Sequence, residues 1–228
     1  MSSEVDICNL ALSHLGDEAT VTSISPPEGS VQSEHCARFY PIARDTLLQM
    51  HAWNFAAKRV LLAPLTILNQ PSTWKHTYAI PNDCSLAMSV MASDAADDYS
   101  SRFTGYENPF MPPLVAAGQY TPQPFSVELA DTATATNVLV LYTNQATATL
   151  RYQAKITDAA SFSPMFVVTL SWQLASMLAG PIIKGDLGAA EAKRCVQMMG
   201  GYLGVAKTAD SVQRFTHIEQ VVPWTSGR

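Results

Sequence analysis

The order of hydrophobic periods along the chain constrains its fold more than any other feature. Apolar residues recur at three- and four-residue spacing near both ends, as in amphipathic helices. In the middle of the chain they alternate with polar residues, as in strands with one covered face. The expected helices cover about 3–16, 30–51, 163–181 and 186–208, and the expected strands cover about 57–62, 74–80, 85–91, 127–130, 138–142 and 147–154. Strands grouped between pairs of helices indicate an α+β fold.

We expect the N- and C-terminal helices to pack into a helical bundle, with a mostly antiparallel β region inserted between the second and third helices. The predicted helical domain comprises residues 1–56 plus 155–210, and the predicted β region comprises 57–154. Within the β region, residues 93–124 hold five prolines and the segment DAADDYSS, a composition typical of a long loop. Residues 211–228 have little helical period and form a predicted C-terminal tail.

Local signals predict where several helices start and stop. Ser3 opens a Ser-x-x-Asp capping box, and Ser163–Pro164 combines a cap residue with a proline at the first helical position. Gly180–Pro181 is predicted to end the third helix. Pro41 lies inside the second helix and removes an amide donor, so we expect a kink or a break near it.

Other dipeptides and glycines predict finer structure. Asn144–Gln145 lies between two strand patterns, which favours a hairpin. Gly200, Gly201 and Gly204 weaken the last helix and suggest close packing or a bend. We expect Trp53 to lie in the core where helix gives way to strand, and Asn54 to bond its own backbone in that turn.

Motifs for catalysis or for cofactor binding do not occur in the sequence. It has no Gly-x-Ser-x-Gly, no phosphate loop and no His-Glu-x-x-His. The histidines show no ligand spacing, and the four cysteines are far apart with no Cys-x-x-Cys pair, so we expect free thiols and no metal. No signal peptide or membrane span is expected, which indicates synthesis in a reducing cytoplasm. No catalytic residue and no cofactor is therefore predicted, and the chain is not expected to be an enzyme.

The low charge content fits two alternatives, a protein that hides surface in an assembly and an ordinary Ala-rich domain. Only 14% of the residues are charged, against about 25% in an average soluble domain. The net charge is −5, and the basic residues are scattered, so tight or sequence-specific DNA binding is not expected. A channel with few phosphate contacts could still let DNA slide through it.

Four segments occur in an order that resembles one protein family. They are ICNLALSHLG at 7–16, ARFYPIARDTLLQMHAWNFAAKRVLLA at 37–63, YAIPNDC at 78–84 and LRYQAKITDAASFSPMFVVTLSWQLASMLAGPI at 150–182. With their FYPxARD and HxWNFA elements, they resemble the tail tubular protein A family of short-tailed bacteriophages, the adaptors that join the capsid portal to the tail. The resemblance runs discontinuously from about Ile7 to about Leu203.

The resemblance implies a structural virion protein located at the head-tail junction and made in the host cytoplasm. It implies a dodecameric ring between the portal protein and the tail nozzle protein, with the helical region against the portal and the strand region facing the nozzle. The ring would line the DNA channel, contact passing double-stranded DNA non-specifically and help to retain the packaged genome. No membrane partner is implied. The insert at 93–124 and the tail depart from the family's pattern.

Two groups of residues are candidates for a portal or subunit interface. Arg44 and Asp45 in FYPIARD are candidates to pair between neighbouring subunits, with a solvated face as the alternative. Apolar residues of the tail are candidate anchors on the portal or on the next subunit. They are Phe215, Val221, Val222 and Trp224. Two other function classes stay open, a cytoplasmic enzyme with a noncanonical site and a soluble binding module that never enters a virion.

Overall fold

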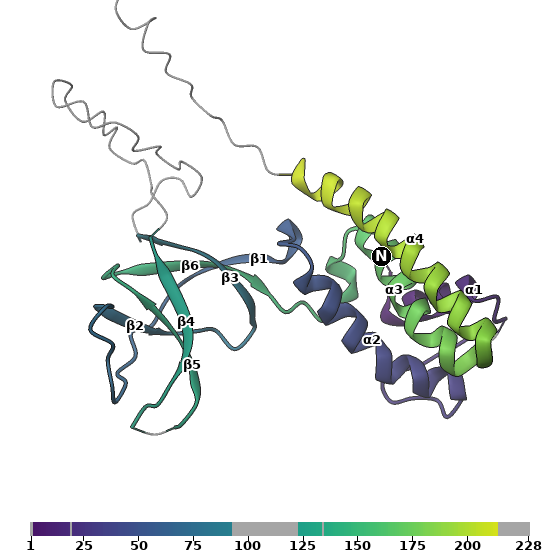
Figure 1. Ribbon diagram of the computed structural model, residues 1–228, viewed down its shortest axis with the longest axis horizontal. Coiled ribbons are helices and arrows are strands. Elements are labelled where there is room, and N and C mark those ends of the chain that lie inside the picture. The colour runs from purple at the N-terminus through teal and green to yellow at the C-terminus, as the bar shows by residue number, and fades with distance from the viewer. Residues whose placement is uncertain (1, 19, 93–122, 134, 214–228) are drawn as a thin grey trace, which may run out of the picture. The chain divides into compact units, whose positions relative to one another are not determined.

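The computed structural model describes residues 2–18, 20–92, 123–133 and 135–213 (Figure 1). It confirms the predicted α+β fold, because the described residues form a helical bundle from both ends of the chain and two small antiparallel sheets from its middle. The chain divides into two compact units. The helical unit contains Met1–Ala57 and Ala154–Arg214, and the β unit contains Lys58–Gln153. Most of the predicted loop 93–124 and of the tail 211–228 lies outside the described residues.

The helical unit consists of long helices whose starts follow the predicted caps. At the start of α1, the Ser3 hydroxyl accepts a hydrogen bond from the Asp6 amide, and the Asp6 carboxylate accepts one from the Ser3 amide. The Ser163 hydroxyl caps α3 in the same way by accepting from the Phe166 amide. The helices are α1 (Glu4–His14), α2 (Val31–Gln49), α3 (Pro164–Ile183) and α4 (Gly185–Ser211), with short 3-10 turns at Asn54–Ala56 and Ala159–Ser161.

Helix α3 is the centre of this unit and contacts α1, α2 and α4. Phe166, Leu170, Leu174 and Leu178 form a fully buried stripe along it. Among the described residues, α3 is the helix whose length and composition alone would allow it to cross a membrane, with a mean hydropathy of 1.6. Because 61% of the 18-residue apolar stretch of α3 is buried, core packing accounts for the apolar sequence of this helix.

The predicted end of the third helix at Gly180–Pro181 is wrong, and of the kink or break predicted near Pro41 the break does not occur. Helix α2 continues through Pro41, which lies on the exposed side while buried residues on the other side hold both halves in the core. Helix α3 continues through Gly180–Pro181 to Ile183. The chain turns at Lys184 and Gly185, whose φ angles of 61° and 60° lie in the left-handed region.

The close packing expected at the three glycines of the last helix does not occur, because all three are exposed. A Cβ atom at Gly200, Gly201 or Gly204 would meet nothing within 4 Å. The close approach occurs at Gly188, where a Cβ would lie 3.0 Å from the Ala179 carbonyl oxygen. The turn between α3 and α4 therefore depends on Gly188, and the other three glycines have no packing partner in the described chain.

The β unit contains two three-stranded sheets. One sheet has the order β1 (Ala57–Leu61), β6 (Ala148–Ala154) and β3 (Cys84–Ala92), and the other has the order β2 (His76–Ala79), β5 (Val138–Thr143) and β4 (Phe125–Ala130). In the second sheet, Leu141 of the central strand lies opposite Tyr78 on one side and Val127 on the other. On the other face of this sheet, Val140 and Tyr142 pack against Ile67.

The predicted hairpin at Asn144–Gln145 is wrong, because β5 and β6 belong to different sheets. A two-residue hairpin turn favours pairs such as Asn-Gly, and here Gln145 stands at the second position. The Tyr78 hydroxyl instead donates to the carbonyl oxygens of Gln145 and Ala146, at 2.8 and 2.6 Å. The Asn144 side chain accepts from the Lys75 amide at 3.0 Å. These contacts hold the segment as a crossover from one sheet to the other.

Candidate interaction sites

Arg44 and Asp45, predicted to pair between subunits, pair with each other in one chain. The Arg44 Nε donates to Asp45 Oδ1 at 2.9 Å, and Lys155 Nζ lies 2.6 Å from Asp45 Oδ2. The Arg44 guanidinium also lies 5.9 Å from the centre of the Tyr40 ring. Only 8% of the Arg44 side chain is exposed. The fold therefore uses Arg44 within the helical unit.

Of the other members of this cluster, Asp45 is half-buried and Lys155 is exposed. Burial acts to raise the pKa of Asp45, but the bonds and charges of Lys155 and Arg44 outweigh it and hold that pKa below its usual range. The carboxylate is thus ionised at neutral pH. An exposed ion pair of this kind contributes about 0–1 kcal/mol. The interface role of Arg44 and Asp45 stays a prediction, in which Asp45 would make the outward contact.

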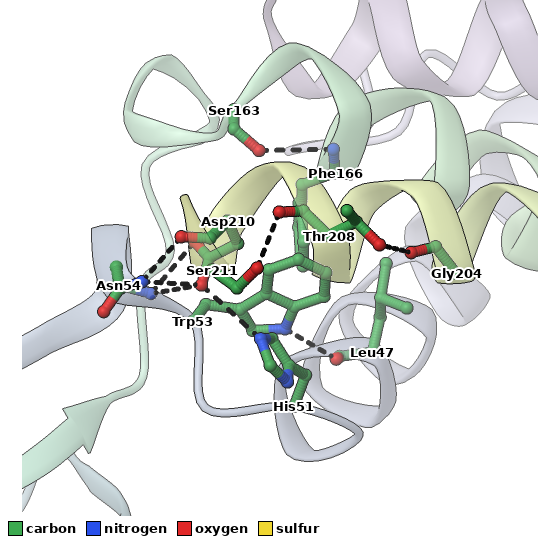
Figure 2. A network of polar contacts seen from close by, with 10 residues as sticks. All are labelled: Leu47, His51, Trp53, Asn54, Ser163, Phe166, Gly204, Thr208, Asp210 and Ser211. Atoms are coloured by element: carbon green, nitrogen blue, oxygen red, sulfur yellow. Dashed lines mark hydrogen bonds and ion pairs between the residues drawn. The ribbon is translucent and has the colours of Figure 1, made fainter. Parts of the chain in front are cut away.

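A second polar network ties the last turn of α4 to the turn that follows α2 (Figure 2). The Asp210 side chain is almost fully buried and accepts from the Asn54 amide at 3.1 and 3.0 Å, one bond to each carboxylate oxygen. The Asn54 side chain donates to Asp210 Oδ2 and to the Asp210 carbonyl oxygen, at 3.0 and 2.8 Å. The prediction that Asn54 serves its own turn is therefore wrong.

Trp53 lies beside this network and is fully buried, as predicted. Its indole nitrogen donates to the Leu47 carbonyl oxygen at 3.1 Å, and its ring meets Phe166 edge-on at 5.1 Å between centres. His51 contacts the same ring edge-on, and its Nε2 lies 3.4 Å from Asp210 Oδ2. A carboxylate at a helix C-terminus is electrostatically unfavourable. The donors of Asn54 and the nearby imidazole of His51 offset that cost, so the network stabilises the fold.

A third cluster surrounds His14 at the end of α1. Its ring stacks on Trp172 with the centres 3.7 Å apart, and Arg194 Nη2 donates to the His14 carbonyl oxygen at 3.0 Å. His14 Nε2 lies 3.0 Å from the Ser171 hydroxyl oxygen. The Ser171 hydroxyl donates its proton to the Val168 carbonyl oxygen at 2.8 Å. Both contacts of Ser171 are satisfied together in the tautomer whose Nε2 donates to Ser171.

An open groove of about 650 Å³ lies beside this cluster. Its apolar wall comes from the ends of α1 and α3 and the start of α4, and its polar groups are His14, Glu191 and Arg194. Arg194 pairs with Glu191 and also contacts the Trp172 ring. These side chains hold one another, and their arrangement does not assemble an acid, a base and a nucleophile around a reacting atom.

His14 makes the stability of the fold depend on pH. Burial lowers the pKa of His14 below 6.5, and the charge of Arg194 lowers it further. Between that lowered pKa and 6.5, the unfolded chain binds a proton that the folded chain does not, so stability falls as the pH falls through this window. We expect His14→Gln, which can still donate to Ser171, to flatten this part of the curve. Urea midpoints from pH 8 to pH 5 test this, and parallel curves for the two proteins would contradict it.

Sequence reasoning missed Asp210, Ser171 and Lys155, because their partners lie more than a hundred residues away in the chain. The tail candidates Phe215, Val221, Val222 and Trp224 lie outside the described residues. Within the described ranges, no group of three or more His, Cys, Asp or Glu side chains could hold a metal ion. Cys8, Cys36, Cys84 and Cys195 are free thiols.

No protein-family model matches this chain, and no curated protein matches it either.

Proposed function

We propose that this protein is a head-to-tail adaptor of a short-tailed bacteriophage, a structural virion protein that acts by geometry. In this proposal twelve copies form a ring between the portal protein and the tail nozzle protein. The ring lines the DNA channel, lets double-stranded DNA pass without specific contacts, and helps to retain the packaged genome. The chain is made in the host cytoplasm and ends in the virion at the head-tail junction.

The observation that carries the proposal is the position of the motif residues in the fold. The segments at 7–16, 37–63 and 150–182 supply much of one core, with Ile7, Leu12, Tyr40, Trp53 and Phe166 all fully or almost fully buried in a single cluster. Segments that share one core constrain one another in shape and volume. A shared core for these segments is what a likeness of fold to the adaptor family requires.

The chemistry of the described side chains supports a role without catalysis. Ser171 and Asp210, two buried polar residues of the helical unit, are engaged in hydrogen bonds that hold the fold together. A channel lining benefits from weak attraction to phosphate, and the net charge of −5 with scattered basic residues fits that need.

Sedimentation velocity with and without a purified portal ring tests the proposal. We expect the protein alone to be monomeric or weakly associated and to shift into a large complex when portal is added, because ordering its partner-binding segments costs entropy that the portal contacts offset. A folded protein that never shifts with portal would favour the enzyme or the soluble binding module. A stable closed ring without portal would contradict templated assembly.

A tail truncation identifies the part of the chain that this assembly needs. The truncation removes residues 214–228 and keeps Ser211, because Ser211 still belongs to α4 and Asp210 carries the network with Asn54. We expect the chain ending at 213 to keep its melting temperature and to lose the portal shift. Trp224→Ala in the full chain is the milder matched variant. Normal portal binding by the truncated protein would remove the tail from the mechanism.

A further inference from the structure

One edge of the second sheet is open along strand β4. In the order β2, β5, β4, this strand pairs with β5 on one side only (Figure 1). Among the described residues, no backbone hydrogen bond reaches residues 125–130 from the other side. The free side of an edge strand presents unpaired amide and carbonyl groups, which form a template for another strand.

The other outer strands of the two sheets are less open than β4. The segment at 63–65 covers the outer side of β2, where the Leu65 amide donates to the Thr77 carbonyl oxygen at 2.9 Å. Strand β1 exposes two adjacent basic residues, and charged side chains on an edge oppose pairing with another strand. Near its end, β3 is bridged to Gln123. Strand β4 is therefore the edge best suited to accept a further strand.

The middle of β4 is uncovered on both faces of the sheet. Val127, Glu128 and Leu129 are exposed in succession. Because side chains alternate along a strand, Val127 and Leu129 lie on one face and Glu128 lies on the other. Leu139 of β5 lies opposite Leu129 and is 46% exposed, and Leu129 itself is 63% exposed. An apolar patch therefore extends across the sheet to its open edge.

Strand β4 is complementary to itself in one antiparallel register. When Val127 lies opposite Val127 of a second copy, Phe125 lies opposite Leu129, and Ser126 lies opposite Glu128. The apolar side chains then meet on one face. On the other face the Ser126 hydroxyl meets the Glu128 carboxylate, a contact that it already makes within one chain at 2.6 Å. A shift that centres the pair on Glu128 would set two like charges directly opposite each other, which is destabilising. The sequence of β4 thus favours a second copy as its partner and one register.

We propose that two copies of this chain pair through β4 in the free protein, so that their three-stranded sheets continue into one sheet. The contact uses the same surface on both copies and has a two-fold axis. It ends at two copies, because the segment at 63–65 covers the opposite edge of each sheet. The strand has 6 residues, against about 20–30 residues on each side of a standard interface, so the dimer is weak.

This pair is separate from the ring of the proposed function. A cyclic ring joins two different surfaces of neighbouring copies, whereas the β4 contact joins one surface to itself. The dimer is therefore a state of the free chain before assembly, and the inference does not rest on the adaptor function.

Sedimentation equilibrium of the full chain over a wide range of protein concentration measures the pairing. We expect a monomer–dimer equilibrium that Val127→Lys weakens by about tenfold or more, because it sets two like charges opposite each other. Leu61→Lys is the matched control, since Leu61 is an exposed apolar residue on β1, an edge strand of the other sheet. It should leave the equilibrium unchanged. Both variants should keep the melting temperature, because both changes are at exposed positions.

Single cysteines test the register in variants that add no charge. Val127→Cys places two thiols directly opposite each other, at a Cα separation of about 4.5–5.5 Å that a disulfide can span. In Leu129→Cys the two thiols are offset by four residues, about 13 Å along the strand, and cannot be bridged. With oxidised glutathione as the oxidant, we expect a covalent dimer from Val127→Cys. We expect none from Leu129→Cys or from the wild type with its free cysteines.

The contrary outcomes each overturn the proposal. A wild type that stays monomeric at every concentration would show that β4 does not pair, and a dimer that persists in Val127→Lys would use another surface. Equal cross-linking of Val127→Cys and Leu129→Cys would contradict the register. Association beyond the dimer would contradict pairing that ends at two copies. A dimer without a shift on portal addition would leave the β4 contact standing and remove the adaptor function, and a portal shift without a dimer would do the reverse.

Discussion

Trp53→Ala should lower the free energy of unfolding by about 3–5 kcal/mol, the usual cost of removing a large buried aromatic side chain. The side chain is fully buried between the end of α2 and the start of α3, where it contacts Phe166, and its indole donates to the Leu47 carbonyl oxygen. The change leaves a cavity and removes one of two donors to that oxygen, which also accepts from the Met50 amide at 3.3 Å. Urea unfolding followed by circular dichroism measures the loss.

Trp53→Phe separates the two contributions. It keeps most of the buried ring but removes the donor to Leu47, so we expect a smaller loss of about 1–2 kcal/mol. Ile42→Ala, at an exposed position on α2, should change little. If Trp53→Ala left the unfolding midpoint unchanged and abolished binding to portal, Trp53 would be an interface anchor and the core assignment would be wrong.

Asp210→Asn should cost about 2–4 kcal/mol, because it removes a buried charge-assisted bond network. Both carboxylate oxygens accept from Asn54, and the new amide would present a donor where the Asn54 amide groups also donate. Asp186→Asn is the matched control. Asp186 lies exposed in the first turn of α4, where a carboxylate contributes only about 0.3–1 kcal/mol through the helix dipole.

A double-mutant cycle between Asp210→Asn and Asn54→Ala tests whether the two residues act as one unit. The two losses should add to more than the loss of the double variant, because each change breaks the same bonds. If the losses of unfolding free energy in the two single variants simply added up in the double variant, Asp210 would stabilise the end of α4 independently of Asn54. The contacts drawn in Figure 2 would then contribute no coupling energy between the two residues.

Local signals in the sequence determined where most elements begin. Ser3 and Ser163 each cap a helix through an amide three residues away, so short segments contain all the atoms of the signal. Gly16 follows α1 with φ +73°, a left-handed conformation that glycine adopts without strain. The strands also lie close to their predicted residues, because alternation is a property of consecutive side chains.

The interface candidates could be located only in part. Arg44 and Asp45 are neighbours in sequence, but their burial and their link to Lys155 depend on how α2 packs against the chain after β6. The tail candidates carry an apolar pattern that the sequence alone makes visible. The sequence of the tail does not identify the surface that these apolar residues contact, because that surface belongs to a partner.

Only the tertiary structure decided which strands pair, where α3 ends and what the buried polar groups bind. Strand β5 could in principle have paired with β6 through Asn144–Gln145, but β2 and β4 occupy its two edges. Asn54 and Asp210 meet across 156 residues of chain. A buried donor must find an acceptor somewhere, and when that acceptor is distant in sequence only the packing of the whole core determines which one it is.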